Sequence, residues 1–186
     1  DQVRAHPSII TAGEPTIVQL EFRAPKQGIA VNGNIHLPFY LKPFNGLLQG
    51  LGPDKKTNTM ISVERSDRGT VEAVNIITNP DWDILSDLKI FVRNTPLHAG
   101  EKIILSFGNN DQKVWAVRKQ KFLIIEAFLD ASGNGQYVKL PSPMLRVLSK
   151  PPEKLFLVVP SYAIVGEPIR VIAYAEDSLR NVCEDY

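Results

Sequence analysis

The stretch from Asp130 to Gly135 holds the oxygen-bearing side chains whose spacing best fits a metal-binding loop. Asp130, Ser132 and Asn134 stand at loop positions 1, 3 and 5, with Gly135 at position 6. An EF-hand loop binds Ca²⁺ through these positions and uses glycine at position 6 for a sharp turn. It also needs a bidentate glutamate at position 12, where this chain has Pro141. We therefore favour a glycine-rich hairpin turn over calcium binding, and we expect no cofactor.

The histidines and the cysteine lie far apart in the sequence. They are His6, His36, His98 and Cys183. The histidines form no HxH or HExxH pattern, and a zinc site needs three or more convergent ligands. The sequence also contains no GxSxG elbow and no glycine-rich phosphate loop. We therefore predict that this chain is not itself an enzyme, and that Cys183 is an incidental thiol.

Three aromatic side chains are candidates for a platform that stacks on sugar rings. They are Trp115, Trp82 and Tyr40, and Trp115 follows a polar loop at residues 108–113 that favours its exposure. Aromatic side chains in a β-sandwich more often pack in the core or at its rim, which is the simpler interpretation. Carbohydrate or another small ligand is therefore the alternative partner.

Strand patterns separated by turn signals run through the first 150 residues, and no long segment has helical periodicity. Residues 16–23 are the clearest case, because Val18, Leu20 and Phe22 alternate with polar residues. Further strands are expected at residues 35–40, 59–65, 71–77, 88–92, 103–107, 122–129, 137–140 and 144–148, and one helical turn at 83–88. The chain is therefore predicted to be all-β, forming an antiparallel, immunoglobulin-like β-sandwich.

Segment 122–129 differs from the other predicted strands, because it is apolar on both alternating sides except at Glu126. This pattern predicts one strand that is buried on both faces or carries a β-bulge.

One stretch of the sequence occurs twice. Both copies read Pro-Ser, four residues, then Gly-Glu-Pro, beginning at Pro7 and at Pro160, an offset of 153 residues. Glycine suits a tight reversal and proline suits the first position of a strand, so each copy predicts a turn that leads into a strand. Internal repetition of this kind indicates duplicated structural units.

The repeat and a stiff Lys150-Pro151-Pro152 joint define two predicted units. Residues 1–150 form the first sandwich, and residues 151–186 form the start of a second, incomplete one. A free-standing immunoglobulin-like unit needs roughly 100 residues. The second unit must therefore pack on the first, pair with another molecule or be completed by further chain.

Composition restricts the partners more than it identifies them. Lys and Arg total 21 against 20 for Asp and Glu, which gives a net charge of +1. The densest basic stretch, residues 118–121, is short, so nucleic acid is not expected as a partner. No apolar run approaches the roughly 20 residues of a transmembrane helix. A single cysteine allows no internal disulfide.

Several turns and strand entries together resemble a known family. These are residues 32–38, residues 100–103 with Gly108, residues 122–140 with their Gly133-Asn134-Gly135 turn, and the second copy of the repeat. They resemble the N-terminal region of a family of large bacterial proteins of unknown function. In that family, β-sandwich modules precede a region similar to PHP-type metal-dependent phosphoesterases. The resemblance implies that any catalytic metal site lies beyond Tyr186, and it assigns no active-site residue here.

The leading functional hypothesis is a non-catalytic accessory module of a larger bacterial protein. Such a module would contact other domains of the same parent chain. The alternative is a carbohydrate- or ligand-binding module. The compartment stays open between bacterial cytoplasm and envelope, because this chain begins at Asp1 without a signal peptide and a leader removed earlier is compatible with that start.

Overall fold

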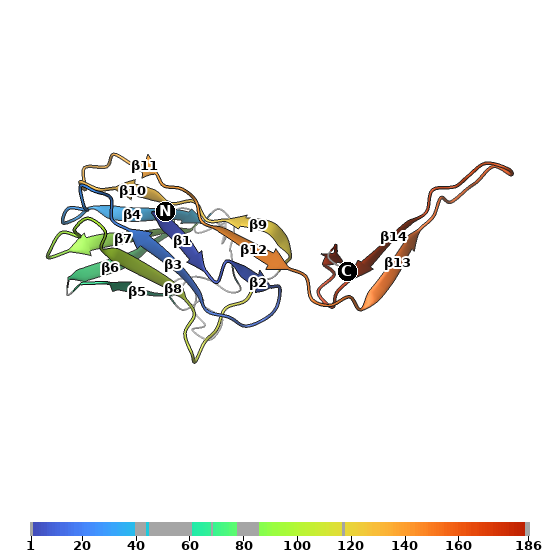
Figure 1. Cartoon of the computed structure of the whole chain (residues 1–186), viewed down its shortest axis with the longest axis horizontal. Coiled ribbons are helices and arrows are strands. Elements are labelled where there is room, and N and C mark those ends of the chain that lie inside the picture. Colours follow the sequence, from blue (N-terminus) through green and yellow to red (C-terminus); the bar gives the residue numbers. More distant parts are fainter. Residues whose placement is uncertain are drawn as a thin grey trace.

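A computed structural model describes residues 2–39, 44, 61–67, 69–77, 86–116 and 118–184 of the chain. Every regular element in these ranges is a β-strand, which confirms the predicted all-β class. Three sheets form the body of the molecule and a fourth lies near its C-terminal end (Figure 1). Within the same ranges no helix is long and apolar enough to cross a membrane.

The first sheet has the strand order β1-β3-β8-β5, and all of its pairs are antiparallel. Its strands are β1 (Val3–His6), β3 (Val18–Arg23), β8 (Lys102–Phe107) and β5 (Ile61–Arg65). The alternation predicted for β3 is confirmed, because Val18, Leu20 and Phe22 are buried to 2% exposure or less. β8 alternates in the same way, so both strands present a continuous apolar face.

The second sheet has the order β11-β10-β4-β7-β6. Its strands are β11 (Val138–Lys139), β10 (Phe128–Asp130), β4 (Asn34–Phe39), β7 (Ser86–Arg93) and β6 (Thr70–Ile77). Phe39 of β4 meets Phe107 of β8 edge to face, with ring centroids 6.0 Å apart. The first two sheets therefore face each other across one apolar core, as in a β-sandwich. The finer, immunoglobulin-like assignment stays a prediction.

The third sheet corrects two expectations from the sequence. It consists of β2 (Ile9–Thr11), β12 (Met144–Leu148) and β9 (Gln120–Ile124), and β2 pairs with β12 in parallel rather than antiparallel orientation. The single strand predicted at residues 122–129 is wrong, because the chain leaves this sheet after β9 and enters the second sheet at β10. Ile125 and Ala127 are buried in the crossing, whereas Ile124, on the other alternating side, is 57% exposed.

The helical turn predicted at residues 83–88 is also wrong for residues 86–88, the part of this segment that the structure describes. Residues 86–88 belong to β7, and residues 83–85 lie outside the described ranges. The segment pairs with β4 over its whole length there, so the ladder determines its conformation.

The fourth sheet is a long hairpin that extends away from the sandwich (Figure 1). It contains β13 (Lys154–Val158), β14 (Ile172–Glu176) and the short β15 (Val182–Cys183), in the order β13-β14-β15. All residues from 151 to 173 are exposed. Among the described residues no second sheet faces this hairpin. The predicted boundary between residues 150 and 151 stays a prediction.

Candidate functional site

A depression of about 700 Å³ lies at one end of the sandwich, where three connecting segments meet. Ile29 and Leu97 exchange two backbone hydrogen bonds of 2.8 Å, which join the β3–β4 connection to the β7–β8 connection. The amide of Ala30 donates to the carbonyl of Ala131 at 2.8 Å and so adds the β10–β11 connection. The walls of the depression are therefore turns held by backbone hydrogen bonds rather than loose loops.

Gly28 allows two of these segments to approach closely. Its φ is 74°, in the left-handed region, and a Cβ there would lie 2.6 Å from the carbonyl oxygen of Leu97. Only glycine combines this conformation with this contact without strain.

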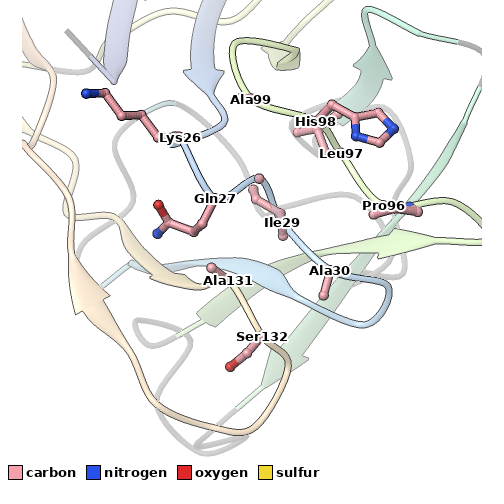
Figure 2. A pocket seen from close by; sticks show the side chains of 11 residues that line it. Lys26, Gln27, Ile29, Ala30, Pro96, Leu97, His98, Ala99, Ala131 and Ser132 are labelled. Atoms are coloured by element: carbon pink, nitrogen blue, oxygen red, sulfur yellow. The ribbon is translucent and has the colours of Figure 1, made fainter.

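The depression is lined by both apolar and polar side chains (Figure 2). The apolar lining residues are Ile29, Ala30, Pro96, Leu97, Ala99 and Ala131. The rim carries Lys26, Gln27, His98 and Ser132, and no lining residue is acidic. Lys26 and His98 extend to opposite sides of the opening in Figure 2. These groups can hydrogen-bond a small molecule, but they do not form a nucleophile–base pair.

Asp130, the first of the candidate metal ligands, closes the turn beside this depression. It is 1% exposed, and its carboxylate accepts the amides of Gly133, Asn134 and Gly135 at 2.8, 3.2 and 2.7 Å. The Ser132 hydroxyl donates to the same carboxylate at 3.3 Å. Four donors therefore already satisfy the carboxylate as a turn cap. Metal binding by Asp130, Ser132 and Asn134, the weaker alternative of the sequence analysis, stays untested.

Of the three candidate aromatic residues, the structure describes Trp115 only. Its side chain is 39% exposed and follows Val114, which forms an isolated bridge with Thr16. Trp115 does not line the depression. Trp82 and Tyr40 lie outside the described residues, so the proposed platform of three rings stays a prediction.

The histidines lie in separate parts of the fold. His6 is on β1, His98 is on the rim of the depression, and His36 is on the outward face of β4. The His36 Nε2 lies 3.3 Å from an oxygen of Asp87, which is ion-pair distance, but the geometry makes no hydrogen bond. Within the described residues no group of three or more His, Cys, Asp or Glu side chains is placed to hold a metal ion.

The outward face of the second sheet gathers aromatic rings that the sequence interpretation missed. Lys89 lies over Tyr137 at 5.6 Å, and Arg93 lies over Phe91 at 4.6 Å. These cations already occupy the faces of the rings, which reduces the area left for stacking on a sugar. The only sign of these rings in the sequence was the alternation of β7, which places Phe91 on the face opposite to that of the buried Ile90.

Asp177 connects the hairpin to the sandwich. Its carboxylate accepts the amides of Lys150, Leu179 and Asn181 at 2.8 to 2.9 Å, and the Asn181 side chain at 2.9 Å. Burial raises the pKa of the Asp177 carboxyl, but these hydrogen bonds outweigh it and hold the pKa below its ordinary value. The Asn181 side chain in turn accepts the amide of Lys119 at 2.8 Å. The junction is therefore a specific hydrogen-bonded contact.

Cys183 also belongs to this junction. Its Sγ lies 3.4 Å from the carbonyl oxygen of Lys150 and 3.7 Å from that of Asn181. The histidines of the described chain lie on β1, on β4 and on the rim of the depression, all outside the fourth sheet.

Comparison with known proteins gives no family for this chain. No protein-family model matches it, and no curated protein matches it.

Proposed function

We infer that this chain is a non-catalytic accessory β-sandwich module of a larger bacterial protein, in which it contacts neighbouring domains. The observation that carries this proposal is the hairpin of β13 and β14, which repeats the opening of the sandwich but leaves its apolar side chains exposed. A hairpin of this kind is a surface for contacts rather than for chemistry. The resemblance to modules that precede a phosphoesterase-like region agrees with this role.

The repeated turn has the same geometry in both copies, which supports duplication. Gly13 and Gly166 both have positive φ, of 71° and 86°. The amides of Glu14 and Glu167 each donate to the carbonyl three residues earlier, at 3.2 and 3.1 Å. Each turn lies between two strands that pair in antiparallel orientation, β1 with β3 and β13 with β14, although β2 precedes the turn in the first copy alone. The second hairpin is therefore proposed as the start of a second unit.

A hydrolysis assay tests the non-catalytic part of the proposal. The purified chain is incubated with phosphate monoesters and diesters in the presence of Mn²⁺ or Zn²⁺, beside a metal-dependent phosphoesterase as positive control. We expect no turnover above the metal-only blank. Turnover that copurifies with the chain through two different columns would contradict an accessory role.

A carbohydrate- or ligand-binding module is the second candidate function. The partial exposure of Trp115 and the depression at the end of the sandwich favour it. Titration of tryptophan fluorescence with soluble polysaccharides tests it, with Trp115→Phe as the matched variant. A saturable change that the variant loses would support this function, and no response to any polysaccharide would count against it.

A further inference from the structure

One face of the C-terminal hairpin is built from leucine and alanine side chains only. In the ladder of β13 and β14, Leu155 pairs with Ala175 and Leu157 pairs with Ala173. Residues directly opposite each other in an antiparallel ladder project to the same side, so these four side chains share a face. Both leucines belong to β13 and both alanines belong to β14, which separates large and small side chains into two columns.

The rest of the described chain does not cover this leucine–alanine face. Leu155 is 72% exposed and Leu157 is 64% exposed. Val159 and Val171, which continue the alternation on the same side, are 57% and 50% exposed. An exposed apolar patch of a few hundred Å² often marks an interaction site. The first sandwich contacts the second unit at residues 177–184 but does not cover the leucine–alanine face.

We propose that, where no further chain completes the second unit, a second copy of this chain covers the leucine–alanine face. A two-fold axis that runs along the strands, midway between two facing hairpins, places β13 of each copy over β14 of the other. Because Leu155 and Ala175 lie at the same level of their own sheet, Leu155 then enters the space above the partner's Ala175. Leu157 enters the space above the partner's Ala173 in the same way. The face is therefore complementary to itself in shape.

The chemistry of the face also suits an identical partner. None of its four side chains carries a charge or a hydrogen-bonding group, so two copies meet without repulsion and without burying an unpaired polar side chain. Facing sheets pack about 10 Å apart with their strands nearly aligned. Two copies would thus form between them a two-layer β-sandwich that neither forms alone.

The size of the face determines how strong this contact is. Burying one leucine or valine side chain removes on the order of 100 Å² of apolar surface from water. By alternation Val159 and Val171 extend the face, so each copy contributes on the order of 300 Å². Tight complexes bury roughly 800 Å² per partner, so we expect a weak dimer whose population depends on concentration.

Sedimentation equilibrium of the whole 186-residue chain tests the proposal. Between roughly 10 µM and 1 mM, a range that brackets weak interfaces, the average mass is expected to rise from one chain towards two. Leu157→Lys should abolish the rise. Val158→Lys, on the opposite face of the same strand and 49% exposed, is the matched control and should retain it. A monomer at every concentration overturns the proposal and leaves the face to a different partner.

Ala173→Leu separates a shaped contact from general apolar adhesion. This substitution adds apolar surface to the face but fills the space that the partner's Leu157 would enter. We expect the association constant to fall at least tenfold, while unchanged β-sheet circular dichroism shows that the chain is folded. Equal or stronger association would contradict the proposed packing. Hydrolytic activity would contradict the accessory role and leave this contact unaffected, so the two proposals fail separately.

Discussion

Each copy of the repeated stretch lies in the connection between two antiparallel strands. The two hairpins share the geometry of the turn but differ in how far their side chains are buried. Val18 of β3 is fully buried, whereas Val171, which stands 153 residues later, is 50% exposed. The first hairpin has the second sheet opposite it across the core, and the second has no facing sheet among the described residues. The comparison shows that turn and alternation make a hairpin, whereas burial depends on a second layer supplied from elsewhere.

The two hairpins also differ by one residue in their pairing. Phe22 pairs with Val3, a separation of 19 residues, whereas Ala175 pairs with Leu155, a separation of 20. A shift of one residue exchanges the faces of a strand. The same turn is therefore compatible with two registers.

The largest difference in the free energy of unfolding is expected between truncation of a leucine in the sandwich and truncation of one in the C-terminal hairpin. Leu105→Ala, at a position with no exposed surface, is expected to lower the free energy of unfolding by about 2–5 kcal/mol, because it leaves a cavity in the core. Leu157→Ala, at a residue that is 64% exposed, is expected to change it by less than about 0.5 kcal/mol. Urea unfolding followed by tryptophan fluorescence measures both. Similar losses would show that the hairpin is part of the same cooperative core.

Removing the cap of the turn at residues 130–135 should have the next largest effect. Asp130→Ala leaves three backbone amides without their acceptor and is expected to cost about 1–3 kcal/mol. Thermal unfolding with and without 5 mM Ca²⁺, a concentration on the order of that which saturates weak sites, checks the alternative. We expect no calcium-dependent shift, and a shift lost in Asp130→Ala would show a metal site.

The glycines of the two repeated turns should respond differently to alanine. Gly13→Ala places a Cβ 2.6 Å from the Leu179 side chain at a φ of 71°, and we expect a loss of about 1–2 kcal/mol. Gly166→Ala meets only the strain of its φ of 86°, because nothing lies within 4 Å of the added Cβ. Since the tip of the hairpin is exposed, we expect its effect on unfolding of the sandwich to be undetectable. Equal losses would show that the two turns are equally coupled to the core.

The smallest expected effect is that of acid, which should loosen the junction between the sandwich and the hairpin. The hydrogen bonds to Asp177 keep its pKa below the value of about 3.9 for an unfolded aspartate. Its contribution is therefore present above that value and is lost as pH falls through the lower, folded pKa. The amide resonances of Lys150 and Asn181 are expected to move as the pH falls below about 4, the ordinary aspartate value. Asp177→Asn should remove this titration, and an identical titration in the variant would exclude Asp177 as its source.

The strands that could be predicted are those with one buried face. β3 and β8 show the expected alternation because polar residues mark their outward sides. Segment 122–129 was misinterpreted, because its apolar residues continue through the crossing from one sheet to the other without a turn signal. β2 was missed because three residues are too few to show a period.

The depression was the least predictable feature. Of its rim residues, the sequence had singled out Ser132 as a weak metal candidate and His98 only as an isolated histidine. Its walls come from three connections separated by tens of residues, and they are joined by backbone hydrogen bonds that no side-chain pattern encodes. The exposed state of Trp115 agrees with the polar loop before it, but its role stays a prediction.

The order of residues alone determined that this protein is made of strands, where several of them turn, and that one turn is used twice. These properties depend on periods of two residues and on glycine and proline conformations, which are local. Only the tertiary structure decided which strands pair, where the chain changes sheets and which apolar face is covered. Those outcomes depend on contacts between distant segments. The same motif gives one hairpin that is covered and one that is exposed, so the motif alone does not determine burial.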